Sequence, residues 1–352
     1  MSVICFDLEG PLSPQDNAYE VMGLVENGHK IFEVLSRYDD ILALERRKNY
    51  EPGDTLSLII PFLLYHKINE GDVKKVSETA GIVPGARETI AKLREWGWNV
   101  NIISTSYQQH AYSIGKHVGV ETENIYCTKL PLNEFYSELK DADFSLVEEL
   151  ESDILEKLYP NMSDDNLLKS RLDRFYYDEL LKTKLGQVFK RVSVVGGERK
   201  VNALKKVAEK TKTKLEGMVA VGDSITDFKM LGLVRDNNGL AIVFNGNEYA
   251  VPYANVGLTC SDMRPILIVL KEFEKGMKEV GDVVKKLEKN VNAADIAIHE
   301  VKKLLMINKN NQNFVQPQFN WLLGVSEEKQ EKIIEAHKKA RKFVRGAAAK
   351  LG

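Results

Sequence analysis

Short runs of consecutive apolar residues recur along the chain, and segments with helical periodicity separate most of them. These runs lie at Val3 to Phe6, Val100 to Ile103, Val192 to Val195, Met218 to Val221 and Leu240 to Phe244. Between some of them, residues 86 to 96 and 200 to 211 repeat their apolar positions every three or four residues. Short continuous apolar runs are typical of strands that are buried on both faces. The alternation predicts an α/β fold built on a doubly wound parallel sheet.

Two long segments interrupt this alternation. Residues 14 to 84 carry helical patterns that follow Asp16-Asn17, a pair that suits a helix N-cap. Residues 133 to 191 begin acidic, then become aromatic and basic, and they are also predicted to be helical. We interpret residues 14 to 84 as a helical cap and residues 133 to 191 as a second helical insertion. The core then consists of the remaining pieces, residues 1 to 13, 85 to 132 and 192 to 262.

The C-terminal part has a different period. From Ile266 to Leu305, apolar residues follow one another at alternating steps of four and three, which indicates a coiled-coil heptad seam. Ser326 then precedes two acids and predicts the start of a last helix, which reaches about residue 350. We therefore expect residues 263 to 352 to form a heptad-patterned helical hairpin. The last helix is the shorter one, so part of residues 266 to 350 needs another partner: the core, a second copy of the chain or another protein.

The overall charge gives little attraction to polyanions. Lys and Arg total 49 against 51 for Asp and Glu, a formal charge of -2. We therefore expect no nucleic-acid partner, and a small, locally recognised ligand instead. The longest strongly apolar run, Leu56 to Tyr65, contains Pro61 and has about half of the ~20 residues that a membrane-spanning helix needs. We expect no membrane span.

The cysteines and the first strand bear on the compartment. Cys5, Cys127 and Cys260 form no CxxC pair, so the sequence suggests neither a disulfide framework nor a zinc site. The first apolar run begins at residue 3 and leaves no room for a signal segment. We expect a reducing compartment and a cytoplasmic protein.

Candidate chemistry begins at the end of the first predicted strand. Asp7 and Glu9 follow that strand, and Gly10 permits a tight turn behind them. Two carboxyl groups would then face one pocket. By itself the pattern is weak, because Asp7 could equally cap a following helix.

A second acidic pair follows the strand predicted at Met218 to Val221. Asp223 stands at its end and Asp227 in the loop beyond. Asp7, Asp223 and a backbone carbonyl would offer the sparse set of oxygens that Mg²⁺ accepts. The alternative is a structural loop in which Asp223 caps a helix.

Two further elements suit a phosphoryl group. Ser104 and Thr105 follow the strand predicted at Val100 to Ile103, and their hydroxyl and N–H groups at the start of a helix could hold phosphoryl oxygens. An ordinary helix cap is the alternative. Lys200 opens the helix before the Asp223 strand and could neutralise the charge of a transferring group. Arg199 and Lys205 compete with Lys200 for this role.

The sequence offers further charged positions outside this set. Arg46, Arg47, Arg171 and Arg174 lie in the two insertions and are candidates for binding the remainder of a substrate. A basic run comprises Lys338, Lys339, Arg341, Lys342 and Arg345. It could bind an acidic partner, but basic residues also suit the C-terminal end of a helix, and we favour a solvated helix face.

The order of the motifs adds a resemblance. Asp7-Leu8-Glu9-Gly10, then Ser104, Lys200 and Gly222-Asp223-x-x-x-Asp227 resemble the haloacid dehalogenase (HAD) superfamily, in particular its phosphoserine phosphatase-like branch. The interval from Lys200 to Asp223, 223 − 200 = 23, is typical of that branch. The commonest pattern has Asp where Glu9 stands. The Asp-x-Glu-Gly form also looks like the first motif of relatives that transfer phosphate to homoserine, and of enolase-phosphatases.

The resemblance implies roles for these residues. Asp7 would attack phosphorus to form an aspartyl-phosphate, and Glu9 would protonate the leaving oxygen and then activate water. Asp7, the Glu9 carbonyl and Asp223 would hold Mg²⁺. Ser104, Thr105 and Lys200 would bind the phosphoryl group, while Asp227 would orient Lys200 or a metal-bound water. The implied activity is Mg²⁺-dependent hydrolysis of a small phosphorylated metabolite.

A closer likeness is to archaeal HAD-like proteins described as a subunit of an energy-converting hydrogenase, which share Asp7-Leu8-Glu9-Gly10-Pro11 followed by Asp16-Asn17. That likeness suggests association instead of a reaction. One alternative function is therefore a weakly active or inactive subunit that binds partners through its C-terminal hairpin. A further alternative is a phosphotransferase.

Overall fold

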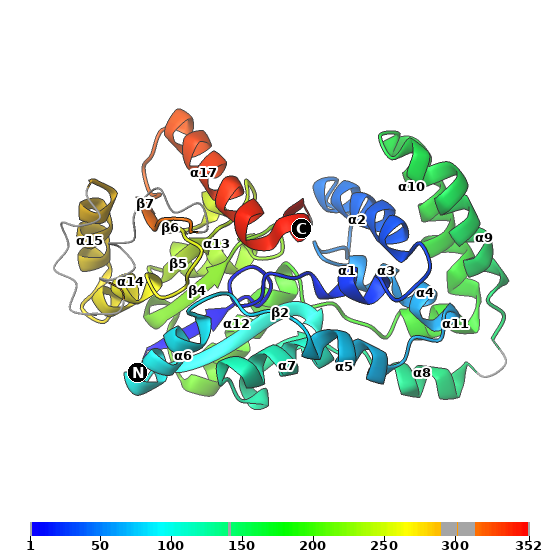
Figure 1. Cartoon of the computed structure of the whole chain (residues 1–352), viewed down its shortest axis with the longest axis horizontal. Coiled ribbons are helices and arrows are strands. Elements are labelled where there is room, and N and C mark those ends of the chain that lie inside the picture. The colour runs from blue at the N-terminus through cyan, green and yellow to red at the C-terminus, as the bar shows by residue number, and fades with distance from the viewer. Residues whose placement is uncertain (1, 140–141, 290–300, 302–313, 351–352) are drawn as a thin grey trace.

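The computed structural model describes residues 2–139, 142–289, 301 and 314–350. Seven strands form one sheet in the order β3-β2-β1-β4-β5-β6-β7 (Figure 1). Neighbouring strands from β3 to β6 are parallel, and β7 is antiparallel to β6. The strands are β1 (Val3–Phe6), β2 (Asn99–Tyr107), β3 (Ile125–Thr128), β4 (Met218–Gly222), β5 (Leu240–Phe244), β6 (Val256–Thr259) and β7 (Gln318–Trp321).

Helices flank the sheet and form a separate group beside it (Figure 1). The α-helices are α1 (Asn17–Met22), α2 (Gly28–Leu44), α3 (Thr55–Leu58), α4 (Ile60–Tyr65), α5 (Glu70–Glu78), α6 (Ala86–Glu95), α7 (Gln108–Val118), α8 (Leu132–Glu138), α9 (Ser145–Asp153), α10 (Asp165–Arg174), α11 (Lys184–Phe189), α12 (Glu198–Thr211), α13 (Phe228–Asp236), α14 (Ile266–Phe273), α15 (Met277–Lys289) and α17 (Glu327–Arg345). Short 3-10 or π turns are η1 (Thr122–Asn124), η2 (Ile154–Leu158), η3 (Tyr159–Asn161), η4 (Phe175–Glu179), η5 (Leu180–Lys182), η6 (Leu215–Gly217), η7 (Val251–Tyr253) and η9 (Gly346–Lys350). Across the described ranges, none of these helices combines the length and the apolar character that crossing a membrane requires.

Alternate residues of each strand face opposite sides of the sheet, as the pleat of a strand requires. Ile4 and Phe6 of β1 pack in one cluster with α6, α7, α14 and α15. Val3 and Cys5 pack in another cluster with α12 and α13. Both faces are therefore covered, which confirms the predicted α/β class with a doubly wound sheet.

The strand predictions hold in part. The run Val192 to Val195 is not a strand: it has no regular secondary structure, and Val195 N–H donates to the Thr128 hydroxyl at 3.0 Å instead of joining a ladder. The short strands β3, β6 and β7 were not predicted. An apolar run indicates burial, but whether it pairs with a strand depends on which backbone lies beside it.

The two predicted insertions share one hydrophobic core. Apolar side chains from both segments form a single buried cluster, including Leu35 and Phe62 from the first and Val147 and Leu172 from the second. Helix α2 lies against α10, and α4 lies against α9. We call residues 14–84 together with 133–139 and 142–191 the helical unit. It occupies the right-hand side of Figure 1, beside the carboxyl ends of the strands.

The C-terminal part differs from the predicted hairpin. Helix α14 ends at Phe273, and Gly276, at φ 136°, separates it from α15. Apolar residues of both helices lie in the core cluster on one face of the sheet, and β7 extends the sheet itself. The rest of the heptad run, except Val301, lies outside the described residues. Residues 266–289 and 318–345 are thus an integral part of the core and not an appendage.

Candidate functional site

The candidate residues meet at the carboxyl ends of adjacent strands. Asp7 follows β1 and Asp223 follows β4, and these strands pair in register with Phe6 opposite Val221. Asp7 N–H also donates to the Val221 carbonyl at 2.8 Å. From β1 the chain continues to β2 and β3 on one side of the sheet and then to β4 and β5 on the other side, so the strand order switches at β1. This is the place where open α/β sheets bind ligands.

Lys200 links two of the carboxylates. Its side chain is fully buried, and its Nζ lies 2.7 Å from Asp7 Oδ1 and 2.7 Å from Asp227 Oδ1. Burial lowers the pKa of Lys200, but the charges of Asp227 and Asp7 raise it by more, so the net direction is upward. Of its two competitors, Arg199 pairs with Asp54 and Lys205 is exposed. Of these three residues, Lys200 is the one that lies against Asp7.

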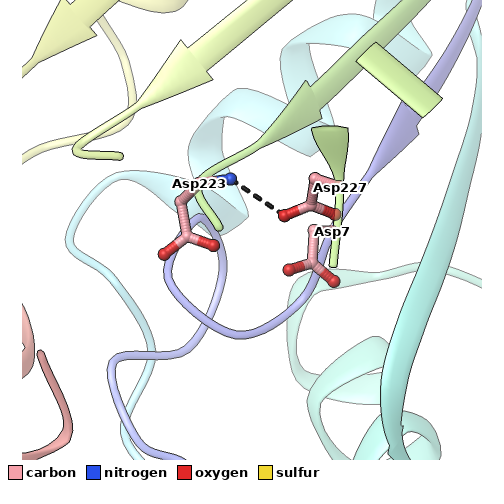
Figure 2. A group of neighbouring side chains, drawn as sticks. All are labelled: Asp7, Asp223 and Asp227. Carbon is pink, nitrogen blue, oxygen red and sulfur yellow. Dashed lines mark hydrogen bonds between the residues drawn. The ribbon is translucent and has the colours of Figure 1, made fainter. Parts of the chain in front are cut away.

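Asp227 connects Lys200 to the loop that carries Asp223. Its Oδ2 accepts the backbone N–H of Asp223 at 3.0 Å and that of Ser224 at 3.1 Å. The first of these bonds is the dashed line in Figure 2, where Asp7, Asp223 and Asp227 gather below the ends of two strands. Asp227 thus holds the Asp223 loop with one oxygen and Lys200 with the other.

The three aspartates fit a divalent cation. One carboxylate oxygen from each lies within 4.8 Å of the others. Asp223 Oδ1 is buried and has no hydrogen-bond partner within the described part of the chain. Burial and the negative charge of Asp227 raise the pKa of Asp7, whereas the Lys200 ammonium lowers it. A bound cation would act in the same direction as Lys200, and the oxygen donor set suits Mg²⁺.

Gly10 allows the loop after β1 to pass directly against Asp223. Its φ is +100°, in the region that favours glycine, and a Cβ at this position would lie 2.1 Å from Asp223 Oδ2. No other residue fits without moving the carboxylate. The turn predicted at Gly10 is therefore also a close contact between two motifs.

Glu9 is held by two donors beside Asp7. Its Oε1 accepts the Ser106 hydroxyl at 2.5 Å and the Asn17 N–H at 3.0 Å. Burial and the nearby charge of Asp16 raise the pKa of Glu9 to about 7, even though both donors favour the ionised form. Near neutral pH this carboxyl group can therefore hold a proton or accept one.

Ser104 and Thr105 lie within β2 and not at the start of a helix, which corrects the prediction for them. The strand continues to Tyr107, and its register with β3 shifts between Ser104 and Tyr107, as at a β-bulge. A bulge redirects side chains at the end of a strand. Both residues line the candidate cavity, and Thr105 Oγ1 is buried without a hydrogen-bond partner among the described residues.

The cavity at this site is small, with a volume of about 60 Å³. Asp7, Glu9, Ser104 and Thr105 line it from the core. The helical unit closes it, and Asp39 reaches it from α2. Asp39 accepts the Tyr50 hydroxyl at 2.6 Å and the Gly53 N–H at 3.2 Å, so it fixes the loop above the site. The pattern of the sequence did not single out Asp39.

Two arginines of α17 were misassigned to a solvated face. Arg341 is 2 % exposed and Arg345 is 9 % exposed, and both line the same cavity. Arg341 donates to Asp223 Oδ2, and Arg345 Nη1 lies 3.3 Å from the same oxygen. Their spacing of four, continued back through His337 to Ile333, marks the buried helix face. The sequence pattern did not reveal this buried face, because charged residues on a helix normally lie in solvent.

The arginines predicted to bind a substrate do not line the cavity. Arg171 pairs with Asp153 at 2.6 Å, and Arg174 pairs with Glu179 at 2.6 Å, both within the helical unit. Arg46 and Arg47 instead border a neighbouring groove of about 630 Å³. Ile225 lines both the groove and the cavity, so the two adjoin.

No family model and no curated protein matches this chain. Gene product AF1437 from Archaeoglobus fulgidus has a similar solved structure, with a TM-score of 0.81 and 28% sequence identity over 100% of this chain and 99% of that one. The two chains therefore share one fold from end to end.

Solved structures of phosphoserine phosphatase also match. An apo form matches with a TM-score of 0.48 and 19% identity over 76% of this chain and 98% of that chain. A phospho-aspartyl intermediate analogue matches with a TM-score of 0.49 and 18% identity over 76% and 97%. The likeness to hydrogenase subunits finds no support in these comparisons.

Proposed function

We propose that this chain is a Mg²⁺-dependent phosphatase of the HAD superfamily, in its phosphoserine phosphatase-like branch, and that it acts on a small phosphorylated metabolite. The observation that carries the proposal is the Lys200 ammonium, buried between Asp7 and Asp227, beside the unpartnered Asp223 Oδ1. A cation, a nucleophilic carboxylate and an open oxygen ligand thus lie at one strand edge. Phosphoryl transfer needs this combination of positioned charges.

In the proposed reaction, Asp7 is the nucleophile. Its carboxylate oxygen attacks phosphorus, the bond from phosphorus to the substrate oxygen breaks, and an aspartyl-phosphate forms. Glu9 gives its proton to the departing oxygen. Glu9 then takes a proton from the water that attacks the aspartyl-phosphate, which releases inorganic phosphate and restores Asp7.

Other residues would bind the transferring group. Lys200 and the hydroxyls of Ser104 and Thr105 would contact phosphoryl oxygens, and Asp227 would keep Lys200 in place. Asp7, Asp223 and the Glu9 carbonyl would hold Mg²⁺. When bound, the ion would offset negative charge on the phosphoryl oxygens.

The size of the cavity bears on the substrate. At about 60 Å³ it is far smaller than the roughly 300–1,000 Å³ of ordinary ligand pockets, so it suits a phosphoryl group alone. The remainder of a substrate would extend toward the adjoining groove, and it would enter when the helical unit moves away from the core. The specific metabolite and the cytoplasmic location stay predictions.

The alternatives are less well supported. The assembly hypothesis used the heptad-patterned hairpin as its binding surface, but among the described residues the apolar side chains of α14 and α15 pack against the sheet. A phosphotransferase would use the same residues and differ only in accepting an alcohol in place of water. It would be recognised by transfer of phosphate to an added alcohol.

The test is hydrolysis of p-nitrophenyl phosphate by the full chain with Mg²⁺ and with a chelator. We expect the chelator to abolish hydrolysis and D7N to reduce it by at least ~1,000-fold, since the nucleophile is removed. D236N, at an exposed aspartate of α13, is the matched control and should retain the rate. Circular dichroism would check folding. An unchanged rate in folded D7N would rule out the assignment of Asp7.

A further inference from the structure

The C-terminal helix α17 presents one face to the site. Ile333 packs in the core cluster beside α12 and α13, and one turn later the buried His337 Nδ1 accepts the Gly246 N–H at 3.0 Å. Arg341 and Arg345 follow at further steps of four and therefore point the same way. The helix is thus anchored upstream, so the position of both arginines is set by the fold and not by flexible side chains at a surface.

The two guanidinium groups converge on one oxygen of Asp223. Both lie at Oδ2, while Oδ1 has no hydrogen-bond partner within the described residues. Arg345 also donates through Nε to the Pro14 carbonyl at 3.2 Å, which holds it against the loop after β1. The carboxylate that would bind a metal ion through Oδ1 therefore already carries two positive charges on its other side.

The two guanidinium groups would repel a cation at Oδ1 across a short, buried distance. Like charges a few ångströms apart repel strongly where water is excluded, so both arginines oppose a divalent ion at Asp223. A phosphoryl dianion in the same cavity is attracted by the arginines and by the ion alike. The ion and the phosphoryl group should therefore each favour the binding of the other.

We infer that Arg341 and Arg345 set the metal affinity of this site, so that the divalent ion binds tightly only together with the phosphoryl group. The inference rests on the proposed function, because it assumes the metal site at Asp7 and Asp223. In thermodynamic terms the arginines weaken the binding of Mg²⁺ to the free protein and strengthen that of the phosphoryl group, and the coupling between these two ligands must be reciprocal.

The experiment is calorimetric titration of the full chain with Mg²⁺, with and without inorganic phosphate. Wild type should bind Mg²⁺ at least about tenfold more tightly when phosphate is present. Without phosphate, R341Q and R345Q should bind Mg²⁺ at least about tenfold more tightly than wild type, and phosphate should tighten their binding less. K342Q removes a charge from the exposed face of the same helix and should behave as wild type.

Equal or weaker Mg²⁺ binding by both arginine variants would overturn the inference, since it would mean that the arginines merely orient Asp223. The wild-type measurement is informative even if the variants do not fold. If phosphate tightens Mg²⁺ binding by wild type less than twofold, the inference is also overturned. D223N separates the two proposals, because it should lose Mg²⁺ binding altogether. If wild type, R341Q and D223N all fail to bind Mg²⁺ with phosphate present, the proposed metal site itself is wrong.

Discussion

At the scale of single residues, the candidate site depends on one buried cation. Lys200 is completely enclosed and contacts Asp7 and Asp227 through the same Nζ atom. A buried charge network is stable only while each member keeps its partners, because a carboxylate left alone loses both water and counter-ion. Lys200 would therefore serve the proposed chemistry as well as the local structure.

Replacing Lys200 with Met should abolish activity and lower the free energy of unfolding by about 3–5 kcal/mol, as expected when one partner of a buried ion pair is removed. Urea denaturation followed by circular dichroism measures the second effect. K205M, at an exposed lysine of the same helix, should change stability by less than about 0.5 kcal/mol. Equal effects of the two substitutions would contradict the assignment of Lys200.

At the scale of elements, the loop after α2 closes the site from above. Glu51 accepts the Glu198 N–H at 2.9 Å and pairs with Lys229 at 2.9 Å, so it joins the helical unit to the start of α12 and to α13. Gly196 makes this approach feasible, since a Cβ there would lie 2.0 Å from the Pro52 carbonyl oxygen. The close contact between two backbones explains the glycine.

G196A should push the Pro52 loop away from the core. We expect it to lower the free energy of unfolding by about 1–3 kcal/mol, as overpacking does, and to reduce the proposed activity because the loop also covers the cavity. Denaturation and the phosphatase assay measure the two effects. G81A is the control, because a Cβ at Gly81 meets only ordinary contacts of 3.4 Å and beyond. A fully stable and active G196A would show that the loop does not need this contact.

At the scale of the whole molecule, the C-terminal segment joins the two parts of the fold. Helix α17 packs on the core, whereas Ala348 of η9 belongs to the cluster of the helical unit and Lys350 pairs with Glu33 of α2 at 2.7 Å. Figure 1 shows this end of the chain beside α2. The far end of the sequence therefore completes a site that begins at residue 7.

Buried acids between the two parts should make stability depend on pH. Burial raises the pKa of Asp54 to about 7, against the opposing charge of Arg199. The folded protein then holds the Asp54 proton more tightly than the unfolded chain does. The contribution of protonated Asp54 to the free energy of unfolding is therefore complete below about pH 4 and is lost as pH rises through about 7.

D54N removes this titration. The free energy of unfolding of D54N, measured by urea denaturation between pH 4 and 8, should therefore decrease less with rising pH than that of wild type. D236N, at an exposed aspartate, should keep the wild-type dependence. Parallel curves for D54N and wild type would show that Asp54 does not titrate in this range.

The sequence by itself determined the α/β alternation and the order of the motifs around Asp7, Ser104, Lys200 and Asp223. These follow from local rules: an apolar run predicts a buried strand, and the residues after parallel strands meet at one edge. The contact of Lys200 with Asp7 does not follow from this rule, because the run before Lys200, Val192 to Val195, is not a strand. It was expected only from the order of the motifs.

Only the tertiary structure decided the places of Arg341, Arg345 and Asp39, the missing strand at Val192 to Val195, and the position of β7. A charged residue on a helix is expected to be exposed to solvent unless a carboxylate from a distant part of the chain neutralises it. The sequence near the charged residue does not indicate such a partner. Likewise, a strand exists only where another backbone offers hydrogen bonds. Composition and periodicity describe how polar a segment is, whereas packing determines what each polar group meets.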